Sequence, residues 1–339
     1  MSALVVRAGR VAVRMERRAV VTAAALTVVA CGLALLGLCQ GATWYTPGEV
    51  LAALTGRGGG TLVITEWRMP RVCAALVFGA ALGVAGAVFQ NLTRNALGSP
   101  DIIGLDAGSY TGALAVITLV GGTSLQLALG SVAGGLAAAG VVYALSVKSG
   151  LSGMRLIVVG IAVNAMLTAL NGWIVLRAEL EVAIAATGWS AGSLNGLDWD
   201  EVALPFALIG VLLALLGVLS HAVHQAALGD ELAVTSGVDL RRLRLLLVLV
   251  GVGCTAVVTS AAGPIVFVAL AAPQIGRRLA GSAGVPFVPA ALTGAVLLLA
   301  ADLAAQTLLA PVALPVGVVT TAIGGAYLIW LLIKEAKKP

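Results

Sequence analysis

The chain has 339 residues, of which 60% are hydrophobic and only 10% are charged, and its net charge is +5. A soluble globular protein carries about 25% charged residues, so this chain has too few polar side chains to form a water-covered surface. A positive charge can indicate nucleic-acid binding, but no nucleic-acid partner is expected, because membrane orientation explains the basic residues. The composition predicts an all-α, polytopic integral membrane protein whose surroundings are a lipid bilayer.

The chain begins with a basic tail, residues 1–18, followed by an apolar stretch. A signal peptide begins in the same way, but this stretch continues past Cys31 and many apolar segments follow, so we predict an uncleaved first helix. A helix needs about 20 apolar residues to cross the membrane. On that scale, Gly, Pro and charged residues predict about ten transmembrane helices, at 19–39, 70–91, 103–121, 125–147, 156–176, 202–222, 244–262, 264–280, 286–309 and 314–334.

The loops between these helices are too short for a soluble domain, so we predict one transmembrane domain over residues 1–339. The segment 182–197 is short and rich in Gly and Ser, which predicts a short external helix or a re-entrant segment. Glycines four residues apart, as in Gly79–Gly83 and Gly130–Gly134, predict helices packed backbone to backbone.

The distribution of Lys and Arg predicts the orientation. Cytoplasmic loops of membrane proteins are enriched in Lys and Arg. With ten helices and both termini in the cytoplasm, only Arg57, Arg68, Arg71 and Arg177 of the 20 Lys and Arg lie outside. The inner side takes Arg7, Arg10, Arg14, Arg17, Arg18, Arg94, Lys148, Arg155, Arg241, Arg242, Arg244, Arg277, Arg278, Lys334, Lys337 and Lys338.

Motifs for covalent chemistry are absent from the sequence. It has neither the P-loop pattern nor the zinc-protease pattern His-Glu-x-x-His, and its four cysteines lie in apolar runs without metal-binding spacing. We therefore expect no catalytic residues, no metal site and no cofactor. Of the acids in apolar segments, Asp302 is the clearest, and we expect it to have a hydrogen-bond partner or to lie near water. Asp101 and Asp106 lie near the start of the third predicted helix.

Three polar segments carry more specific information than hydropathy does. The first runs from Arg68-Met69-Pro70-Arg71 through a Gly/Ala helix to residues 89–104, the second covers residues 228–244, and the third covers residues 262–279. Their order and spacing resemble the FecCD family, the permease subunits of ABC importers for iron–siderophore complexes, haem and cobalamin. The similarity runs from about residue 45 to the end and includes the ten-helix layout.

The second segment predicts a short helix–turn–helix on the cytoplasmic surface. Gly229 can break the preceding helix, Asp230 can cap a new one, and Gly237 offers a turn. The resemblance implies that this cytoplasmic coupling segment, residues 223–243, docks on the ATPase subunit; an ordinary solvated loop is the alternative. The residues expected to couple are Leu228, Gly229, Asp230, Glu231, Leu232, Ala233 and Gly237.

Arg68 and Arg71 lie three residues apart at the outer mouth of the second predicted helix, which puts them on one face. The resemblance implies that these arginines bind acidic residues of the substrate-binding protein, and Arg suits such pairing through its two-pronged guanidinium. The alternative is contact with lipid headgroups. Some family members carry a further Arg near the position of Gln306, which leaves the docking geometry open.

The resemblance also implies a translocation path between two permease subunits, lined by the fifth predicted helix and residues 182–197. Asn164, Thr168 and Asn171 form one polar face of that helix, with hydrogen bonding between packed helices as the competing role.

We therefore predict a non-enzymatic permease subunit of an ATP-driven importer in the inner (plasma) membrane. Its expected partners are two ATPase subunits, a second permease subunit that is identical or paralogous, and an extracytoplasmic siderophore-binding protein. Residues 89–95 and 192–196 resemble the catecholate-siderophore branch, the enterobactin-type permeases. Haem or cobalamin import, an ion-coupled secondary carrier and a structural or receptor-like subunit remain alternatives.

Overall fold

The computed structural model describes residues 3–8, 11–101, 104–121, 123–147, 153–282, 284 and 286–336. Arg10, Lys148, Lys337 and Lys338, which the predicted orientation uses, lie outside the described residues. The helices are α1 (Arg17–Cys39), α2 (Pro47–Leu54), the π-helix η1 (Val63–Arg68), α3 (Met69–Thr93), α4 (Leu105–Leu119), α5 (Ser124–Val147), α6 (Gly153–Arg177), α7 (Leu180–Ser190), α8 (Trp199–Ala227), α9 (Asp230–Thr235), α10 (Leu240–Ala262), α11 (Val268–Ala280), α12 (Phe287–Thr307) and α13 (Val316–Ala336).

The described part of the chain is helical apart from one antiparallel hairpin, β1 (Ala3–Ala8) and β2 (Val11–Glu16). The expected all-α class therefore holds for everything after residue 16. The prediction of a basic tail at residues 1–18 did not include this hairpin, although both strands contain two valines, which favour β-structure. Helix α1 begins at Arg17, so Arg17 and Arg18 belong to the helix rather than to the tail.

Each of the ten predicted ranges contains a helix, and within the described residues seven helices are long and apolar enough to cross a membrane. The ten-span count itself stays a prediction, because α4 and α11 have only 15 and 13 residues. The range 264–280 was predicted too long. Gly263 and Phe267 both have positive φ, 69° and 71°, and Pro264 has no N–H to donate, so regular helix starts only at Val268.

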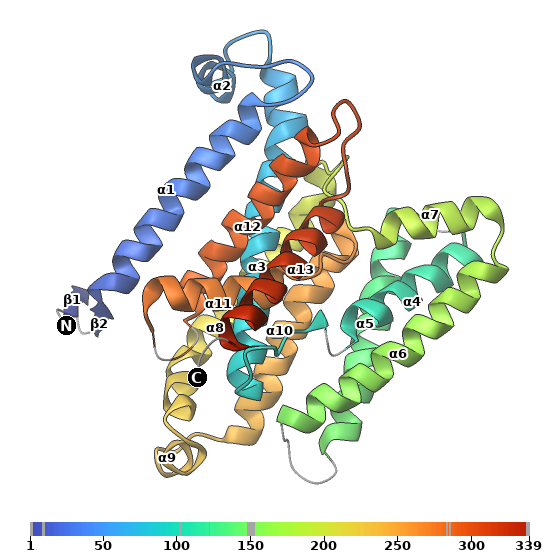
Figure 1. Ribbon diagram of the computed structural model, residues 1–339. Helices are drawn as coiled ribbons and strands as arrows, with labels where there is room; N and C mark the ends of the chain where they lie inside the picture. The colour runs from blue at the N-terminus through green and yellow to red at the C-terminus, as the bar shows by residue number, and fades with distance from the viewer. Residues whose placement is uncertain are drawn as a thin grey trace.

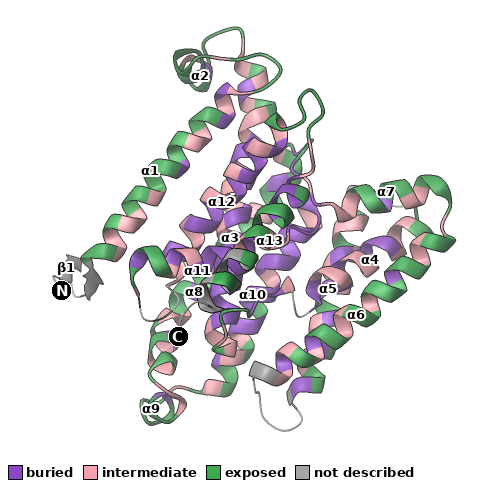
Figure 2. Ribbon diagram, viewed as in Figure 1, coloured by how far each residue is buried: buried purple, intermediate pink, exposed green. Residues whose placement is uncertain are grey.

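The most buried helices stand at the centre of the molecule. Helices α3, α10 and α12 are mostly enclosed by other helices, whereas α1 and α6 are mostly exposed (Figure 2). Helices α8, α11 and α13 complete the central group around α3, and α4 to α7 form a second group beside it (Figure 1). The exposed side chains of α1 and α6 are largely apolar, as expected for helices that face lipid.

Glycine allows the central helices to approach closely, as the sequence predicts. A Cβ atom at Gly79 or Gly83 would overlap the backbone carbonyl of Gly294 or Ala290 on α12, and one at Gly86 would overlap the carbonyl of Ala269 on α11. The second pair behaves in the same way, since Gly130 and Gly134 of α5 face the backbone of α4. These helices therefore pack through backbone contact, which is typical of membrane proteins.

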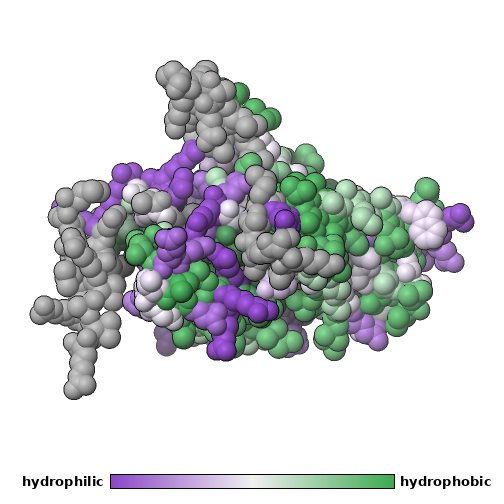
Figure 3. All heavy atoms as spheres, turned by 90° about the horizontal axis from the view of Figure 1, so that it is seen from below, coloured by the Kyte–Doolittle hydropathy of each residue, from purple (hydrophilic) through white to green (hydrophobic). Residues whose placement is uncertain are grey.

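The two ends of the bundle differ in what they carry. Both chain termini lie on the half of the molecule that carries α9, and α2 lies at the opposite end (Figure 1). Viewed onto the α9 end, hydrophilic side chains gather in one region beside a broad hydrophobic area (Figure 3). At the α2 end, the indole Nε1 of Trp199 donates to the carbonyl of Thr65 at 2.8 Å and joins the start of α8 to η1.

Candidate functional site

The predicted coupling segment contains a single short helix, α9, between two long ones. Gly229 has φ 127° and Gly237 has φ 86°, conformations that suit glycine, and they bound the helix on either side. The N–H of Val238 donates to the carbonyl of Ala233 at 3.0 Å and closes the turn after α9. The Ala233 side chain is fully buried. The helix and turn expected from the sequence are therefore present.

Asp230 has a different role from the expected one. Gly229, not Asp230, is the N-cap of α9, and no side chain caps the helix. Asp230 stands in the first turn, and its two carboxylate oxygens accept from two arginines. Arg94 Nη2 lies 2.8 Å from Oδ1, and Arg244 Nη2 lies 2.7 Å from Oδ2. Those partners lie 136 and 14 residues away in the chain, so local spacing could not reveal the first of them.

The outer surface of α9 is apolar. The side chains of Leu228, Leu232 and Val234 are 73%, 59% and 58% exposed. Glu231 is also exposed and lies beside them. Leu232 and Val234 lie on α9 and Leu228 lies just before it, so three large aliphatic side chains are exposed together at a polar end of the molecule. Such a surface is suited to contact with another protein.

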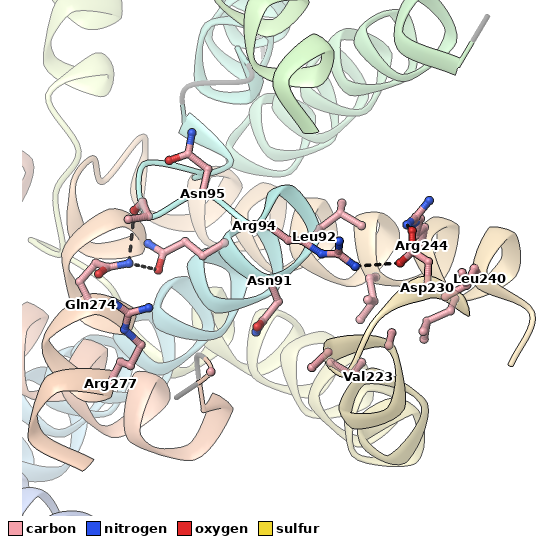
Figure 4. Close-up of a pocket in the computed structure, with 17 residues that line it drawn as sticks. Asn91, Leu92, Arg94, Asn95, Val223, Asp230, Leu240, Arg244, Gln274 and Arg277 are labelled. Carbon is pink, nitrogen blue, oxygen red and sulfur yellow. Dashed lines mark hydrogen bonds and ion pairs between the residues drawn. The ribbon is translucent and has the colours of Figure 1, made fainter. Parts of the chain in front are cut away.

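A cavity of about 280 Å³ lies beside Asp230. It is lined by the end of α3 and by parts of α8, α10 and α11 (Figure 4). On its other side, Gln274 Nε2 donates to Gln90 Oε1 at 2.6 Å, and Gln90 Nε2 donates to the carbonyl of Leu270 at 3.0 Å. These buried amides join α3 to α11. Gln90 lies about one turn before Arg94, the residue that contacts Asp230 of α9.

At the opposite end, two nitrogens of the Arg68 guanidinium bind the backbone of its own chain. Its Nη1 donates to the carbonyls of Leu38 and Cys39 at 2.8 and 2.9 Å, and its Nη2 donates to the carbonyl of Thr43 at 2.6 Å. The guanidinium also lies 4.9 Å from the centre of the Tyr45 ring. Arg68 therefore satisfies carbonyl groups at the end of α1, where the helix dipole favours a positive charge.

Arg71 points into the bundle. Its Nε and Nη2 donate to Asp302 Oδ2 and Oδ1 at 2.9 and 2.8 Å, and Gln306 Nε2 donates to the same Oδ2 at 2.9 Å. Asp302 has the partner that was expected for it. Arg68 and Arg71 thus lie near one another on η1 and α3, but both guanidinium groups are bound within the chain.

The three polar residues of α6 separate into different environments. Asn171 is buried, donates to the carbonyl of Ala107 at 3.0 Å and accepts from Thr111 Oγ1 at 2.7 Å, so it joins α6 to α4. Asn164 is half-buried beside Gly104, and Thr168 is exposed. The packing alternative therefore describes Asn171, whereas Thr168 remains available to a path or a partner.

Two further acids, Asp101 and Asp106, are half-buried near the start of α4. Asp106 Oδ1 lies 3.5 Å from Thr259 Oγ1. Asp101 Oδ1 and Asp106 Oδ2 are buried without a hydrogen-bond partner among the described residues. Within that part of the chain, no group of three or more His, Cys, Asp or Glu side chains is placed to hold a metal ion.

Comparison with known proteins decides the family. Residues 26–334 match the model of the FecCD transport family. The chain belongs to the FecCD transport family. It is 46% identical over 327 residues to the ferric enterobactin transport system permease protein FepG of Escherichia coli, covering 96% of this chain and 99% of FepG. The resemblance inferred from the three polar segments is therefore confirmed.

Other relatives are named as permeases for siderophores or for vitamin B12. The chain is 36% identical over 321 residues to the siderophore transport system permease protein YfhA of Bacillus subtilis, covering 92% of each chain. It is 34% identical over 328 residues to the vitamin B12 import system permease protein BtuC of Salmonella paratyphi A, covering 96% of this chain and 98% of BtuC. A metal-chelate type ABC transporter solved in an inward-facing conformation has the same fold, with a TM-score of 0.80, 24% identity and coverage of 93% and 99% of the two chains.

Proposed function

We propose that this chain is the transmembrane permease subunit of an ATP-driven importer in the inner membrane, and that it carries a ferric siderophore. The observation that carries the proposal is the near full-length similarity to family members named as siderophore permeases. The relative at 46% identity handles ferric enterobactin, which favours a catecholate siderophore over haem or cobalamin. The chain itself performs no covalent step.

The substrate is tested by uptake into proteoliposomes that contain the complete transporter. Radiolabelled ferric enterobactin, a ferric hydroxamate, haem and cobalamin are supplied in parallel with their binding proteins. We expect ATP-dependent uptake of the catecholate complex. Uptake of cobalamin or haem alone would replace the siderophore proposal and leave the permease role intact.

The ATPase subunits dock on α9 in this proposal. Leu228, Leu232 and Val234 provide an apolar contact, and Glu231 provides a charged one. Replacing Leu232 with Asp puts a charge at the centre of that contact, where desolvation is costly. We expect loss of ATPase co-purification for Leu232→Asp, and no loss for Leu119→Asp, which changes a more exposed leucine, 82% against 59%, at the end of α4.

The substrate-binding protein docks at the α2 end, with Arg68 and Arg71 as the proposed contacts. Their bonds within the chain limit how many donors remain for a partner protein. Arg71 cannot leave Asp302, because the buried carboxylate would then have no compensating charge. The unused edge of each guanidinium is what a partner carboxylate would reach. Arg57 is exposed at the same α2 end. Its substitution is the control when the affinity for the binding protein is measured.

A second permease subunit, identical or paralogous, completes the translocation path in this proposal. Thr168 is exposed on α6, the helix that would line that path, and Asn164 is half-buried beside Gly104. Co-purification of two differently tagged copies of this chain tests the identical-subunit case, and recovery of a single tag points to a paralogous partner.

An ion-coupled carrier is the second candidate. The observation that favours it is that Asp101 and Asp106 each have one buried carboxylate oxygen without a hydrogen-bond partner among the described residues. Such carriers bind protons or cations at intramembrane acids. Uptake that continues without ATP, collapses with an ionophore and is lost in Asp106→Asn would support this candidate. Uptake that requires ATP and survives the ionophore supports the importer.

A further inference from the structure

One carboxylate in the first turn of α9 binds two other helices. Asp230 binds Arg94 through one oxygen and Arg244 through the other, at 2.8 and 2.7 Å (Figure 4). Arg94 is the residue that follows the last turn of α3, and Arg244 lies in the second turn of α10. A single side chain of α9 therefore connects it to two of the most buried helices in the molecule.

The end of α3 is shaped for this contact. Arg94 is the C-cap of α3 and has φ 50° and ψ 32°, a left-handed conformation that few residues other than glycine adopt. In the part of the chain that the structure describes, Phe267 is the only other non-glycine residue with positive φ. A backbone held in this sparsely populated conformation must be fixed by its surroundings, and such residues cluster at functional sites.

Helix α3 can carry a displacement from this end into the bundle. Its glycines bring its backbone against α12 and α11, and Gln90 joins it to α11 by a buried hydrogen bond. Packed helices of this kind move as units rather than deforming. A movement of α3 therefore shifts α11 and α12 with it.

The bridge itself contributes little to folding. The side chains of Arg94 and Asp230 are 63% and 45% exposed, and exposed ion pairs are weak and screened by salt. Arg94, Asp230 and Arg244 together carry one excess positive charge. Without Asp230, the two guanidinium groups would therefore face each other without a negative charge between them. Its weakness and its position between three helices favour a role in motion over a role in stability.

We infer that Asp230 is the link through which α9 moves α3 and α10, with Arg94 and Arg244 as positioning residues that transmit the movement. This inference rests on the proposed docking of the ATPase subunits on α9. Docking would use the outer apolar side chains of α9, and transmission would use the inner carboxylate. The two functions therefore reside in different residues of one short helix.

The test separates uptake from ATP hydrolysis in the complete reconstituted transporter. Arg94→Gln and Arg244→Gln are compared with the unchanged protein for ATPase co-purification, for ATP hydrolysis stimulated by loaded binding protein, and for uptake of radiolabelled ferric enterobactin. We expect co-purification and hydrolysis to persist. Uptake per ATP should fall about fivefold or more, which is the size of effect that coupling between two sites typically produces. Arg94→Lys keeps the charge and should restore part of the ratio.

Arg17→Gln is the matched control, because Arg17 is exposed and forms no ion pair within the described residues. Its uptake per ATP should equal that of the unchanged protein. The double variant Arg94→Gln with Asp230→Asn should be no worse than Asp230→Asn alone, because both changes break one link.

Unchanged uptake per ATP in both arginine variants would overturn the inference. So would a fall that Arg17→Gln shares, or a double variant with strictly additive losses. Thermal unfolding in detergent is measured for each variant, and a loss of fold in Arg94→Gln or Arg244→Gln would also count against the inference, because it would assign the bridge to stability. Failure of the docking proposal gives a different result, with ATPase co-purification unaffected by Leu232→Asp.

Discussion

Arg71 and Asp302 form a two-point ion pair across 231 residues of sequence, with both N–O distances below 3 Å. The Asp302 side chain is 1% exposed and that of Arg71 is 18% exposed. Gln306 adds a third hydrogen bond to the same carboxylate. This pair neutralises an acid in the last third of the apolar helix α12, which would otherwise be costly to bury, and it fixes α3 against α12 toward the α2 end.

Breaking the pair should destabilise the protein strongly. Removing one partner of a buried ion pair typically costs about 3–5 kcal/mol, because the other charge stays buried without compensation. We expect Arg71→Gln to lower the midpoint of thermal unfolding in detergent markedly, and the double variant Arg71→Gln with Asp302→Asn to recover part of the loss. Arg57→Gln, at an exposed position of the α2 end, should have no effect on the midpoint. A double variant as unstable as the sum of the singles would contradict this account.

Arg68 should behave as a helix cap rather than as an ion-pair partner. Its three hydrogen bonds go to backbone carbonyls at and beyond the end of α1. A lysine ammonium cannot reproduce the planar, two-pronged guanidinium, so Arg68→Lys should lose most of the stabilisation that these hydrogen bonds provide. Hydrogen bonds to charged groups contribute about 1.5–3 kcal/mol, and we expect Arg68→Lys to lower unfolding stability by about that amount. Equal stability of Arg68→Lys and the unchanged protein would show that the carbonyls do not depend on the guanidinium.

Hydropathy predicts where the helices are, because a length of about 20 apolar residues is a physical requirement of the bilayer. It fails at α11, where Pro264 and the left-handed Phe267 delay the helix although the segment is apolar. Hydropathy also gives no information about which side chains contact one another. Local spacing predicted the helix and turn at α9 correctly but assigned Asp230 a capping role, since Arg94 is 136 residues distant.

The outer arginines show the same limit. Their spacing placed Arg68 and Arg71 together at one mouth, and the fold confirms that proximity. Whether a guanidinium faces a partner protein or its own chain depends on where α1 and α12 end, which no local pattern encodes. Asp302 could be predicted to need a partner, but not which one.

The close contact between α3 and α11 makes Gly86 intolerant of any side chain. A Cβ atom there would overlap the carbonyl group of Ala269, which belongs to a helix backbone and cannot rotate away. Overpacking of this kind typically costs about 1–3 kcal/mol, so Gly86→Ala should lower the unfolding midpoint and uptake together. Gly210→Ala on α8 has open space around the new methyl and should be neutral or stabilising by up to about 1 kcal/mol. Equal effects of the two substitutions would contradict the contact.

The polar residues of α6 offer a test that separates packing from transport. Asn171 is buried and joins α6 to α4 through Ala107 and Thr111. Hydrogen bonds between membrane helices contribute about 0.6 kcal/mol on average and at most about 1.7 kcal/mol. Asn171→Leu should therefore reduce thermal stability modestly, and uptake should fall only as far as the folded fraction falls.

Thr168 lies on the same helix, one turn away, and its side chain is exposed. Its removal breaks no contact between α4 and α6, so Thr168→Ala should leave the unfolding midpoint unchanged. If the exposed face of α6 lines the translocation path, then a bulky, charged replacement such as Thr168→Arg should block uptake while the ATPase subunits still co-purify. Full uptake by Thr168→Arg would show that the path lies elsewhere. A guanidinium in the lining would change the width and the charge of a path that a large ferric complex must pass through.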